Sequence, residues 1–104
     1  MQTIRISTEA AQELEEAVAW YEKEQKGLGA RLIDAFEHAL QLLREPSPPL
    51  TPYNDEIEGR KIKKLILHKF PFSVIIADIH DSMVIVALAH HSRKPGYWDE
   101  RIRQ

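Results

Sequence analysis

The hydrophobic positions of this chain follow a strand period near both ends and a helical period between them. Residues 3–7 alternate polar and apolar side chains, which predicts a short strand with one buried face. Residues 70–79 and 83–90 are rich in Val and Ile, and they predict two buried strands joined by a polar turn at residues 80–82. Residues 57–68 predict another strand, which is interrupted by cationic side chains.

The helical period covers two segments separated by glycine. Apolar residues recur every three or four positions from residue 8 to about residue 26, and again from about residue 28 to residue 44. Gly27-Leu28-Gly29 ends or bends the first helix, because glycine accepts left-handed backbone at little cost. A short glycine linker predicts an antiparallel helical hairpin. Three acidic residues of the first helix are expected mostly on its other faces: Glu13, Glu16 and Glu24.

The connection after the second helix is rich in proline. Pro46, Pro48, Pro49 and Pro52 exclude a continuing helix and predict an extended surface segment that runs to residue 56. The element order is therefore β-α-α-β-β-β, followed by a short helical tail near residues 96–103. We expect an α+β fold in which the helical hairpin packs on one face of a twisted antiparallel sheet of about four strands. The 104 residues suffice for one domain, residues 1–104.

Composition narrows the class of protein further. The chain has no cysteine, which excludes disulfides and thiolate metal sites. It has no apolar run of about 18 residues and no secretory signal pattern at its start, so we expect a cytoplasmic protein with no membrane partner. No cofactor is expected from the sequence.

Charge is distributed unevenly along the chain. Residues 1–56 hold 5 Lys and Arg against 11 Asp and Glu, whereas residues 57–104 hold 9 against 5, and the net charge is −2. If the second half forms one face, that face can attract phosphate although the whole protein is slightly acidic. In a plainer interpretation, the acidic helices only solvate the first half.

Two polar clusters carry the candidate chemistry. The last strand ends in His90-His91-Ser92-Arg93-Lys94, which puts these side chains at the rim of a rigid sheet. The strand of residues 57–68 carries four cations: Arg60, Lys61, Lys63 and Lys64. Because strand side chains alternate, the cations at 61 and 63 share one side and those at 60 and 64 the other. They can contact phosphate, or they can solvate an edge strand and block unwanted pairing. The histidines have no metal-ligand spacing, so no metal site is predicted.

Five features, in this order along the chain, resemble one known family. They are Ala19-Trp20-Tyr21-Glu22, the Gly-Leu-Gly linker at 27–29, the proline-rich connection, Phe70-Pro71-Phe72, and the closing run from His90 to Trp98. Together they resemble the RelE/ParE superfamily of toxins from type II toxin–antitoxin modules, often labelled plasmid stabilisation proteins. The resemblance covers nearly the whole chain. It implies two N-terminal helices against a twisted antiparallel sheet, which matches the fold expected above.

The resemblance implies a toxin that arrests growth until a cognate antitoxin neutralises it. RelE-like members cut messenger RNA within the ribosome without a metal, whereas ParE-like members poison DNA gyrase and are not known as nucleases. The implied partners are therefore the antitoxin and either the ribosome with its mRNA or DNA gyrase, in a toxin–antitoxin hetero-oligomer or as a homodimer. If the protein is an enzyme, it is a ribosome-dependent endoribonuclease. A non-enzymatic gyrase-binding module and a non-toxic relic that only binds antitoxin are the alternatives.

The RelE-like alternative assigns roles to particular residues. The catalytic candidates at matching positions are Arg93, His91, His90, Tyr97 and Lys63. The guanidinium fork suits a phosphate clamp, an imidazole suits an acid or a base, and the phenol can stack on a base. The candidate nucleic-acid contacts are Lys61, Lys63, Arg60, Lys64 and Lys94. Adjacent strand residues face opposite sides, so the two histidines cannot both face one substrate. Tyr97 and Trp98 can instead pin the tail to the sheet.

The antitoxin is expected to use features that the fold leaves open. An exposed edge strand and an apolar groove are natural docking points, by strand addition or by a helix laid in the groove. We therefore expect an uncovered apolar patch on the free toxin.

Overall fold

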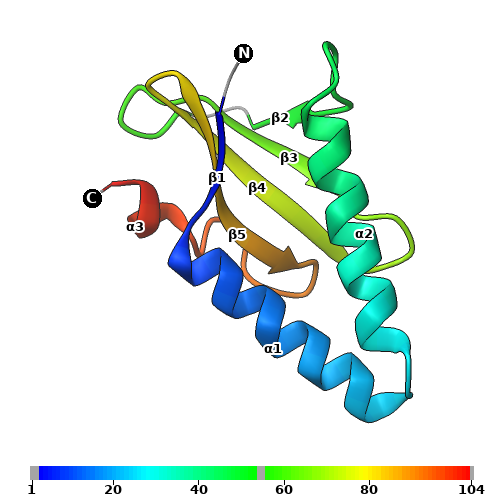
Figure 1. Cartoon of the computed structure of the whole chain (residues 1–104). Helices are drawn as coiled ribbons and strands as arrows, with labels where there is room; N and C mark the ends of the chain where they lie inside the picture. The colour runs from blue at the N-terminus through cyan, green and yellow to red at the C-terminus, as the bar shows by residue number, and fades with distance from the viewer. Residues whose placement is uncertain (1–2, 54–55, 104) are drawn as a thin grey trace.

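The computed structural model describes residues 3–53 and 56–103, and it has the expected α+β fold. Asn54 and Asp55 of the predicted extended connection lie outside the described residues, as do both ends of the predicted domain 1–104. The elements in chain order are β1 (Thr3–Ile6), α1 (Thr8–Glu24), α2 (Leu28–Leu43), β2 (Thr51–Pro52), β3 (Ile62–Ile66), β4 (Phe72–Ile79), β5 (Ser82–His90) and α3 (Asp99–Ile102). In Figure 1, α1 and α2 form the two arms of a V beside a twisted sheet.

The sheet differs from the expectation in strand number and in the direction of one strand. It has five strands in the order β1-β5-β4-β3-β2, because Thr51–Pro52 of the proline-rich connection pairs with β3. β1 runs parallel to β5, whereas the other neighbours are antiparallel. The expectation of about four antiparallel strands is therefore corrected to a mixed sheet of five. The helical hairpin connects β1 at one edge of the sheet to β2 at the other edge. The chain then crosses back through β3, β4 and β5, and β5 lies beside β1.

The two faces of the sheet build two separate cores. On the face toward α1 and α2, here called the helix side, Leu32 of α2 is buried in the same cluster as Ile76 of β4. On the opposite face, the tail side, Ile75 is buried with Trp98 and Ile102 of the C-terminal segment. Trp98 is only 4% exposed, so the tail forms a second layer on the sheet, as the pinning role predicted for this residue requires.

A β-bulge in β5 changes the alternation of side chains along the strand. Ile75 of β4 pairs with Ala87, while the next residue, Ile76, pairs with Ile85, so Val86 is the extra residue. Val86 and Ala87 consequently both belong to the tail-side core. The alternation then resumes toward the end of the strand.

Glu22 of α1 explains the Gly-Leu-Gly linker. Both of its carboxylate oxygens accept the backbone N–H of Gly27 at 3.0 Å, and Oε1 also accepts the N–H of Gly29 at 3.0 Å. This carboxylate serves the N-terminus of α2, which has no side-chain cap of its own. Gly27 has φ 94°, and a Cβ at Gly29 would lie 2.9 Å from the carbonyl oxygen of Val18. Gly27 is therefore needed for the turn between the helices, and Gly29 is needed where α2 approaches the backbone of α1.

Candidate functional site

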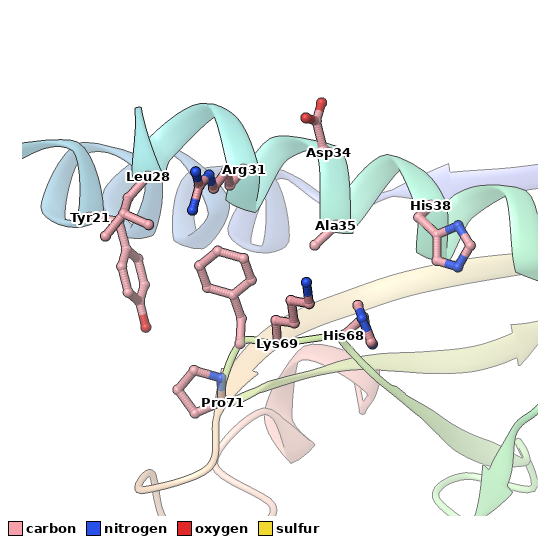
Figure 2. Close-up of a pocket in the computed structure, with 10 residues that line it drawn as sticks. Tyr21, Leu28, Arg31, Asp34, Ala35, His38, His68, Lys69 and Pro71 are labelled. Carbon is pink, nitrogen blue, oxygen red and sulfur yellow. The ribbon is translucent and has the colours of Figure 1, made fainter. Parts of the chain in front are cut away.

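A groove runs between α2 and the loop that joins β3 to β4 (Figure 2). We call it the α2 groove. Its two adjoining parts have volumes of about 700 Å³ and 510 Å³ and share the lining residues Ala35, His38, His68 and Lys69. Figure 2 shows His38 on α2 above His68 and Lys69 of the loop. Lys69 has φ 68°, a backbone conformation that non-glycine residues rarely adopt, so the loop is held in an unusual shape at the groove.

A second hollow, the tail-side hollow, lies where β3 and β4 meet the segment that follows β5. It has a volume of about 440 Å³, and none of its lining residues is Asp or Glu. His91 lies at its wall, with Nε2 3.0 Å from the hydroxyl oxygen of the buried Ser73. The guanidinium carbon of Arg93 lies 3.9 Å from the centre of the Tyr97 ring. Two lysines complete the cationic lining: Lys64 and Lys94.

His90 packs on the helix side, although it also borders the tail-side hollow. Its ring meets that of Phe72 edge-on, with 5.0 Å between ring centres. Its Nδ1 accepts the backbone N–H of Ser92 at 3.0 Å, so the neutral ring carries its proton on Nε2. On this side His90 and the exposed Trp20 help to line a hollow of about 310 Å³, here called the helix-side hollow. The two adjacent histidines thus make their main contacts on opposite sides of the sheet.

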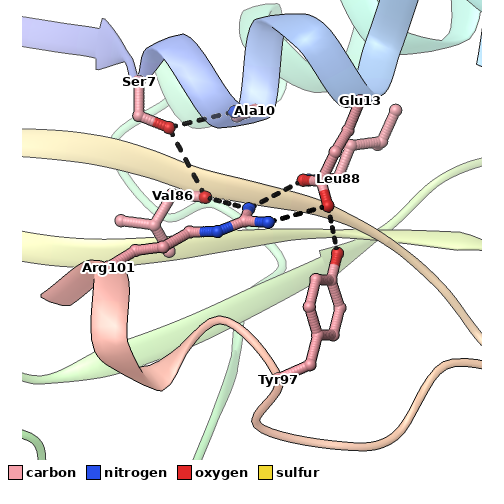
Figure 3. Close-up of polar contacts among 7 residues, drawn as sticks. All are labelled: Ser7, Ala10, Glu13, Val86, Leu88, Tyr97 and Arg101. Carbon is pink, nitrogen blue, oxygen red and sulfur yellow. Dashed lines mark hydrogen bonds and ion pairs between the residues drawn. The ribbon is translucent and has the colours of Figure 1, made fainter. Parts of the chain in front are cut away.

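Glu13 of α1 ties the tail to the rest of the fold (Figure 3). The Tyr97 hydroxyl donates to Oε2 at 2.6 Å, and Arg101 donates to both carboxylate oxygens at 2.9 Å and 3.1 Å. The backbone N–H of Leu88 in β5 donates to Oε1 at 3.1 Å. Arg101 also donates to the carbonyl of Val86, the bulge residue, at 2.9 Å. One carboxylate therefore joins α1, β5 and the C-terminal segment.

The contacts in this network shift the pKa values of Glu13 and Tyr97 in opposite directions. Burial acts to raise the pKa of Glu13, but the hydrogen bonds from Arg101, Tyr97 and Leu88 outweigh it, so the pKa lies below the ordinary value of 4.5. Burial raises the pKa of the Tyr97 phenol, and its hydrogen bond to the negative Glu13 raises it further. Tyr97 therefore keeps its proton far above neutral pH and donates it to Glu13.

Sequence reasoning missed the role of Glu13, and the expectation that it lies on an outer face is wrong. The signal is its position in the helix: residue 13 follows Ala10 by three and precedes Ala17 by four. Ala10 is buried and Ala17 is half-buried in the helix-side core, so a residue between them at this spacing faces the sheet. A charged residue inside an apolar stripe indicates a partner of opposite charge at the sheet, which here is the partly exposed Arg101.

The cations of the strand of residues 57–68 do not form one cluster. Lys63 follows Ile62 of the tail-side core, so it faces the helix side, where it forms an ion pair with Asp78 at 3.1 Å. Arg60 donates to the carbonyl of Ile102 at 2.6 Å. Lys61 is exposed just before β3 and lines none of the hollows above.

The tail-side hollow therefore gathers part of the predicted set. It brings together His91, Arg93, Lys94, Lys64 and the Tyr97 ring, and it leaves out Arg60, Lys61 and Lys63. The catalytic and nucleic-acid-binding roles of these residues stay predictions. Over residues 3–53 and 56–103, no three His, Cys, Asp or Glu side chains are grouped so that they could hold a metal ion. In the same part of the chain, no helix is long and apolar enough to cross a membrane.

Comparisons with known proteins identify the family. The fold is similar to a chain of the solved structure titled "Chromosomal ParDE TA system from P. aeruginosa", with a TM-score of 0.70 and 15% sequence identity. The similarity covers 86% of this chain and 96% of that chain. No curated protein sequence matches this chain. The sequence model of the family described as "ParE toxin of type II toxin-antitoxin system, parDE" matches residues 4–95.

These findings define the protein first as a toxin of the type II toxin–antitoxin class. Within that class, the chain belongs to the ParE toxin family. The superfamily predicted from the sequence is thereby confirmed. The matched region includes Lys64, His91, Arg93 and Lys94 of the tail-side hollow and ends before Tyr97.

Proposed function

We propose that this toxin arrests growth by binding and inhibiting DNA gyrase without cutting RNA, until a cognate antitoxin neutralises it. The observation that carries the proposal is that Tyr97 and Lys63, two of the five catalytic candidates, are already engaged by carboxylates of the fold. The phenol proton is engaged by Glu13 at 2.6 Å, and the ammonium is paired with Asp78 at 3.1 Å. Metal-free RNA cleavage needs a base, a charge-stabilising group and an acid close to one phosphate. Membership of the ParE family supports the same branch.

Two assays test this proposal together. The toxin is induced in cells without antitoxin while growth, mapped transcript ends and plasmid supercoiling are followed, and purified toxin is added to a gyrase supercoiling reaction that contains no ribosomes. We expect growth arrest, relaxed plasmid, intact transcripts and inhibition in the purified reaction. Transcripts cut at defined positions with unchanged supercoiling would overturn the proposal. Normal growth with abundant folded toxin would point to the non-toxic relic.

RelE-like cleavage is the second candidate function, because His91 and Arg93 share the tail-side hollow with Lys64 and Lys94. In that case the imidazole would act as acid or base and the guanidinium would clamp the phosphate. Replacing Arg93 or His91 by Ala should then abolish transcript cleavage on ribosomes while the fold and antitoxin binding persist. Unchanged cleavage in both variants would reject this site.

We further propose that the antitoxin docks in the α2 groove. β2 pairs with β3 at Lys63 and Lys64, and the following Tyr53 bonds to Ile62; within the described residues no strand pairs with the outer edge of β3 at Ile66, which is 57% exposed. Leu67 donates its N–H to Phe72 of the neighbouring strand, which leaves the backbone groups of Ile66 pointing outward. An extended peptide can pair with this edge and place apolar side chains in the groove.

The charge of the groove indicates the kind of antitoxin segment that fits. Four basic side chains line it against one acidic residue: Arg31, His38, His68 and Lys69 against Asp34. In Figure 2, Asp34 points away from the loop, so an acidic amphipathic segment would meet mainly basic groups. The substitution Ala35→Glu would put a bulky negative side chain in the groove. It should weaken antitoxin binding at least tenfold, whereas Ile33→Glu, on the same helix outside the groove, should not. Equal affinity of both variants would reject the groove.

A further inference from the structure

We propose that the helix-side hollow and the exposed side of α1 beside it bind a basic surface of DNA gyrase and take up one of its lysine or arginine side chains. This surface would carry out the gyrase inhibition proposed above, on which the inference rests. Trp20 marks the place, because its side chain borders the hollow and is 57% exposed. Leaving a ring of this size in water is unfavourable, and tryptophan is enriched among the residues that anchor protein–protein interfaces.

Aromatic rings form the wall of the hollow to which Trp20 belongs. The Trp20 ring meets that of Tyr21 edge-on, with 5.0 Å between ring centres, and Tyr21 meets Phe72 at 6.2 Å. The faces of such rings attract a cation, and their carbon atoms pack against the apolar stem of a lysine or arginine. The hollow has a volume of about 310 Å³, at the lower end of the roughly 300–1,000 Å³ of small-ligand sites. It therefore suits one long side chain.

Glu16 gives the lining of the hollow a carboxylate that the fold leaves unpaired. The other carboxylate of the lining, Glu13, is paired with Arg101 at 2.9 Å. The guanidinium of Arg93 also borders the hollow, but it is stacked on the Tyr97 ring at 3.9 Å. Among the described residues, the ion pairs do not include Glu16, which is exposed. A cationic side chain that enters the hollow would therefore meet aromatic rings and an unpaired carboxylate.

The exposed side of α1 extends this negative charge along the helix. Three glutamates and one tryptophan form an exposed row, here called the α1 stripe: Glu9, Glu16, Trp20 and Glu24. Their spacings of seven, four and four residues put them on one side of the helix. The whole of α1 contains six Glu and one Lys, and no ion pair of the described residues uses a carboxylate of the stripe. Such a row is complementary to a basic surface.

Gyrase is a partner that offers a basic surface. An enzyme that supercoils DNA must hold the duplex, and it does so with lysines and arginines that contact the phosphates. The α2 groove is itself basic and would repel that surface, so charge separates the face proposed for the antitoxin from the face proposed for gyrase. Tyr21 lines both the α2 groove and the helix-side hollow. An antitoxin segment that follows the groove past Tyr21 would therefore cover the hollow and exclude gyrase.

Two assays with purified toxin and purified gyrase test the inference: binding by biolayer interferometry and inhibition of supercoiling. Trp20→Ala should weaken both roughly tenfold or more, because it removes the anchor and one ring of the hollow. Glu16→Lys should weaken binding about tenfold, chiefly by slowing association, and should lower its dependence on salt. Two α2 variants, Ile33→Ala and Glu37→Lys, make the same kinds of change at exposed positions outside the hollow. They should bind like the unchanged protein, and a thermal melt checks the folding of every variant.

The outcomes separate this surface from the proposed function itself. If the unchanged toxin neither binds nor inhibits gyrase, the proposed function fails and the inference fails with it. If the unchanged toxin inhibits gyrase and the folded Trp20 and Glu16 variants inhibit it equally well, only the α1 surface is wrong. Equal losses in the α2 control variants would also reject the α1 surface. A toxin dimer that Trp20→Ala dissolves, while gyrase binding stays unchanged, would assign the hollow to a second copy of the chain.

Discussion

Replacing Glu13 by Gln removes the charge on which α1, β5 and the tail converge. The change keeps the size of the side chain and one carbonyl oxygen, but it ends the ion pair with Arg101 and weakens the acceptor for Tyr97. The side chains of Glu13 and Arg101 are 15% and 21% exposed, so solvent screens their attraction only in part. Unfolding by urea, followed by circular dichroism, measures the effect.

The expected magnitude follows from the contacts. Removing one partner of a fully buried pair costs about 3–5 kcal/mol, and a hydrogen bond to a charged group contributes about 1.5–3 kcal/mol. Because the pair is partly exposed and the amide keeps an acceptor, we expect a loss of about 2 kcal/mol in unfolding free energy. That corresponds to a Tm lower by roughly 10 °C for a domain near 100 residues.

The control is Glu15→Gln, an exposed position on the same helix. Surface changes of this kind stay within about 0.5 kcal/mol. Equal losses in the Glu13 and Glu15 variants would refute the role assigned to the half-buried Glu13 carboxylate.

The pH dependence gives a second test of the same contact. The folded state lowers the pKa of Glu13 below 4.5, so the unfolded chain takes up this proton first as the pH falls. The stabilisation is therefore complete above about pH 4.5 and is lost as the pH falls through the lower folded pKa. The stability difference between the unchanged protein and Glu13→Gln should shrink over that range. A difference that stays constant from neutral pH to pH 3 would refute the electrostatic origin.

Three further predictions concern the tail and the helical hairpin. Tyr97→Phe should lose about 1.5 kcal/mol in urea unfolding, since it removes a hydrogen bond to a charged acceptor; the loss should persist up to pH 10, because the folded pKa is raised above 10 and the bond breaks only when the pH rises through it. Gly29→Ala should destabilise the protein in thermal melts by about 1–3 kcal/mol, because the new Cβ would lie 2.9 Å from the Val18 carbonyl oxygen. Helix propensity alone predicts a gain of about 1 kcal/mol, so the sign of the measured stability change distinguishes the clash from the propensity effect. Trp98→Ala should cost about 3–5 kcal/mol and increase binding of a hydrophobic dye, because it uncovers the tail-side core.

Most elements of this fold could be predicted from periodicity, since α1, α2, β4 and β5 are long and strongly patterned. β2 could not be predicted, because two residues that include a proline carry no period. The parallel pairing of β1 could not be predicted either. Alternation tells which face of a strand is buried, but it says nothing of the neighbour or its direction.

The candidate site was predictable where its residues follow one another along the chain. His91, Arg93 and Lys94 reach one hollow because they directly follow β5. Lys63 and Lys64 show what the sequence could not predict. The alternation of strand side chains put them on opposite faces of the sheet, but it did not tell which face the C-terminal segment covers. The structure pairs Lys63 with Asp78 on the helix side and leaves Lys64 to the tail-side hollow. That choice depends on long-range packing of Trp98 and Ile102, which local sequence does not encode.

The extra residue in β5 shifts the alternation of side chains between the two faces of the sheet by one position. Met83 and Ile85 belong to the helix-side core before it, and Leu88 belongs to the same core after it, at an odd spacing that an unbroken strand would forbid. Deleting Val86 would remove the bulge and leave a regular strand in which Ala87 still pairs with Ile75, so the two imidazoles at its end would keep their surroundings. Lengthening or shortening the strand by two residues elsewhere would keep that facing. A one-residue deletion should therefore be tolerated at the bulge, whereas the same deletion elsewhere in β5 would reverse the facing of all positions on one side of it.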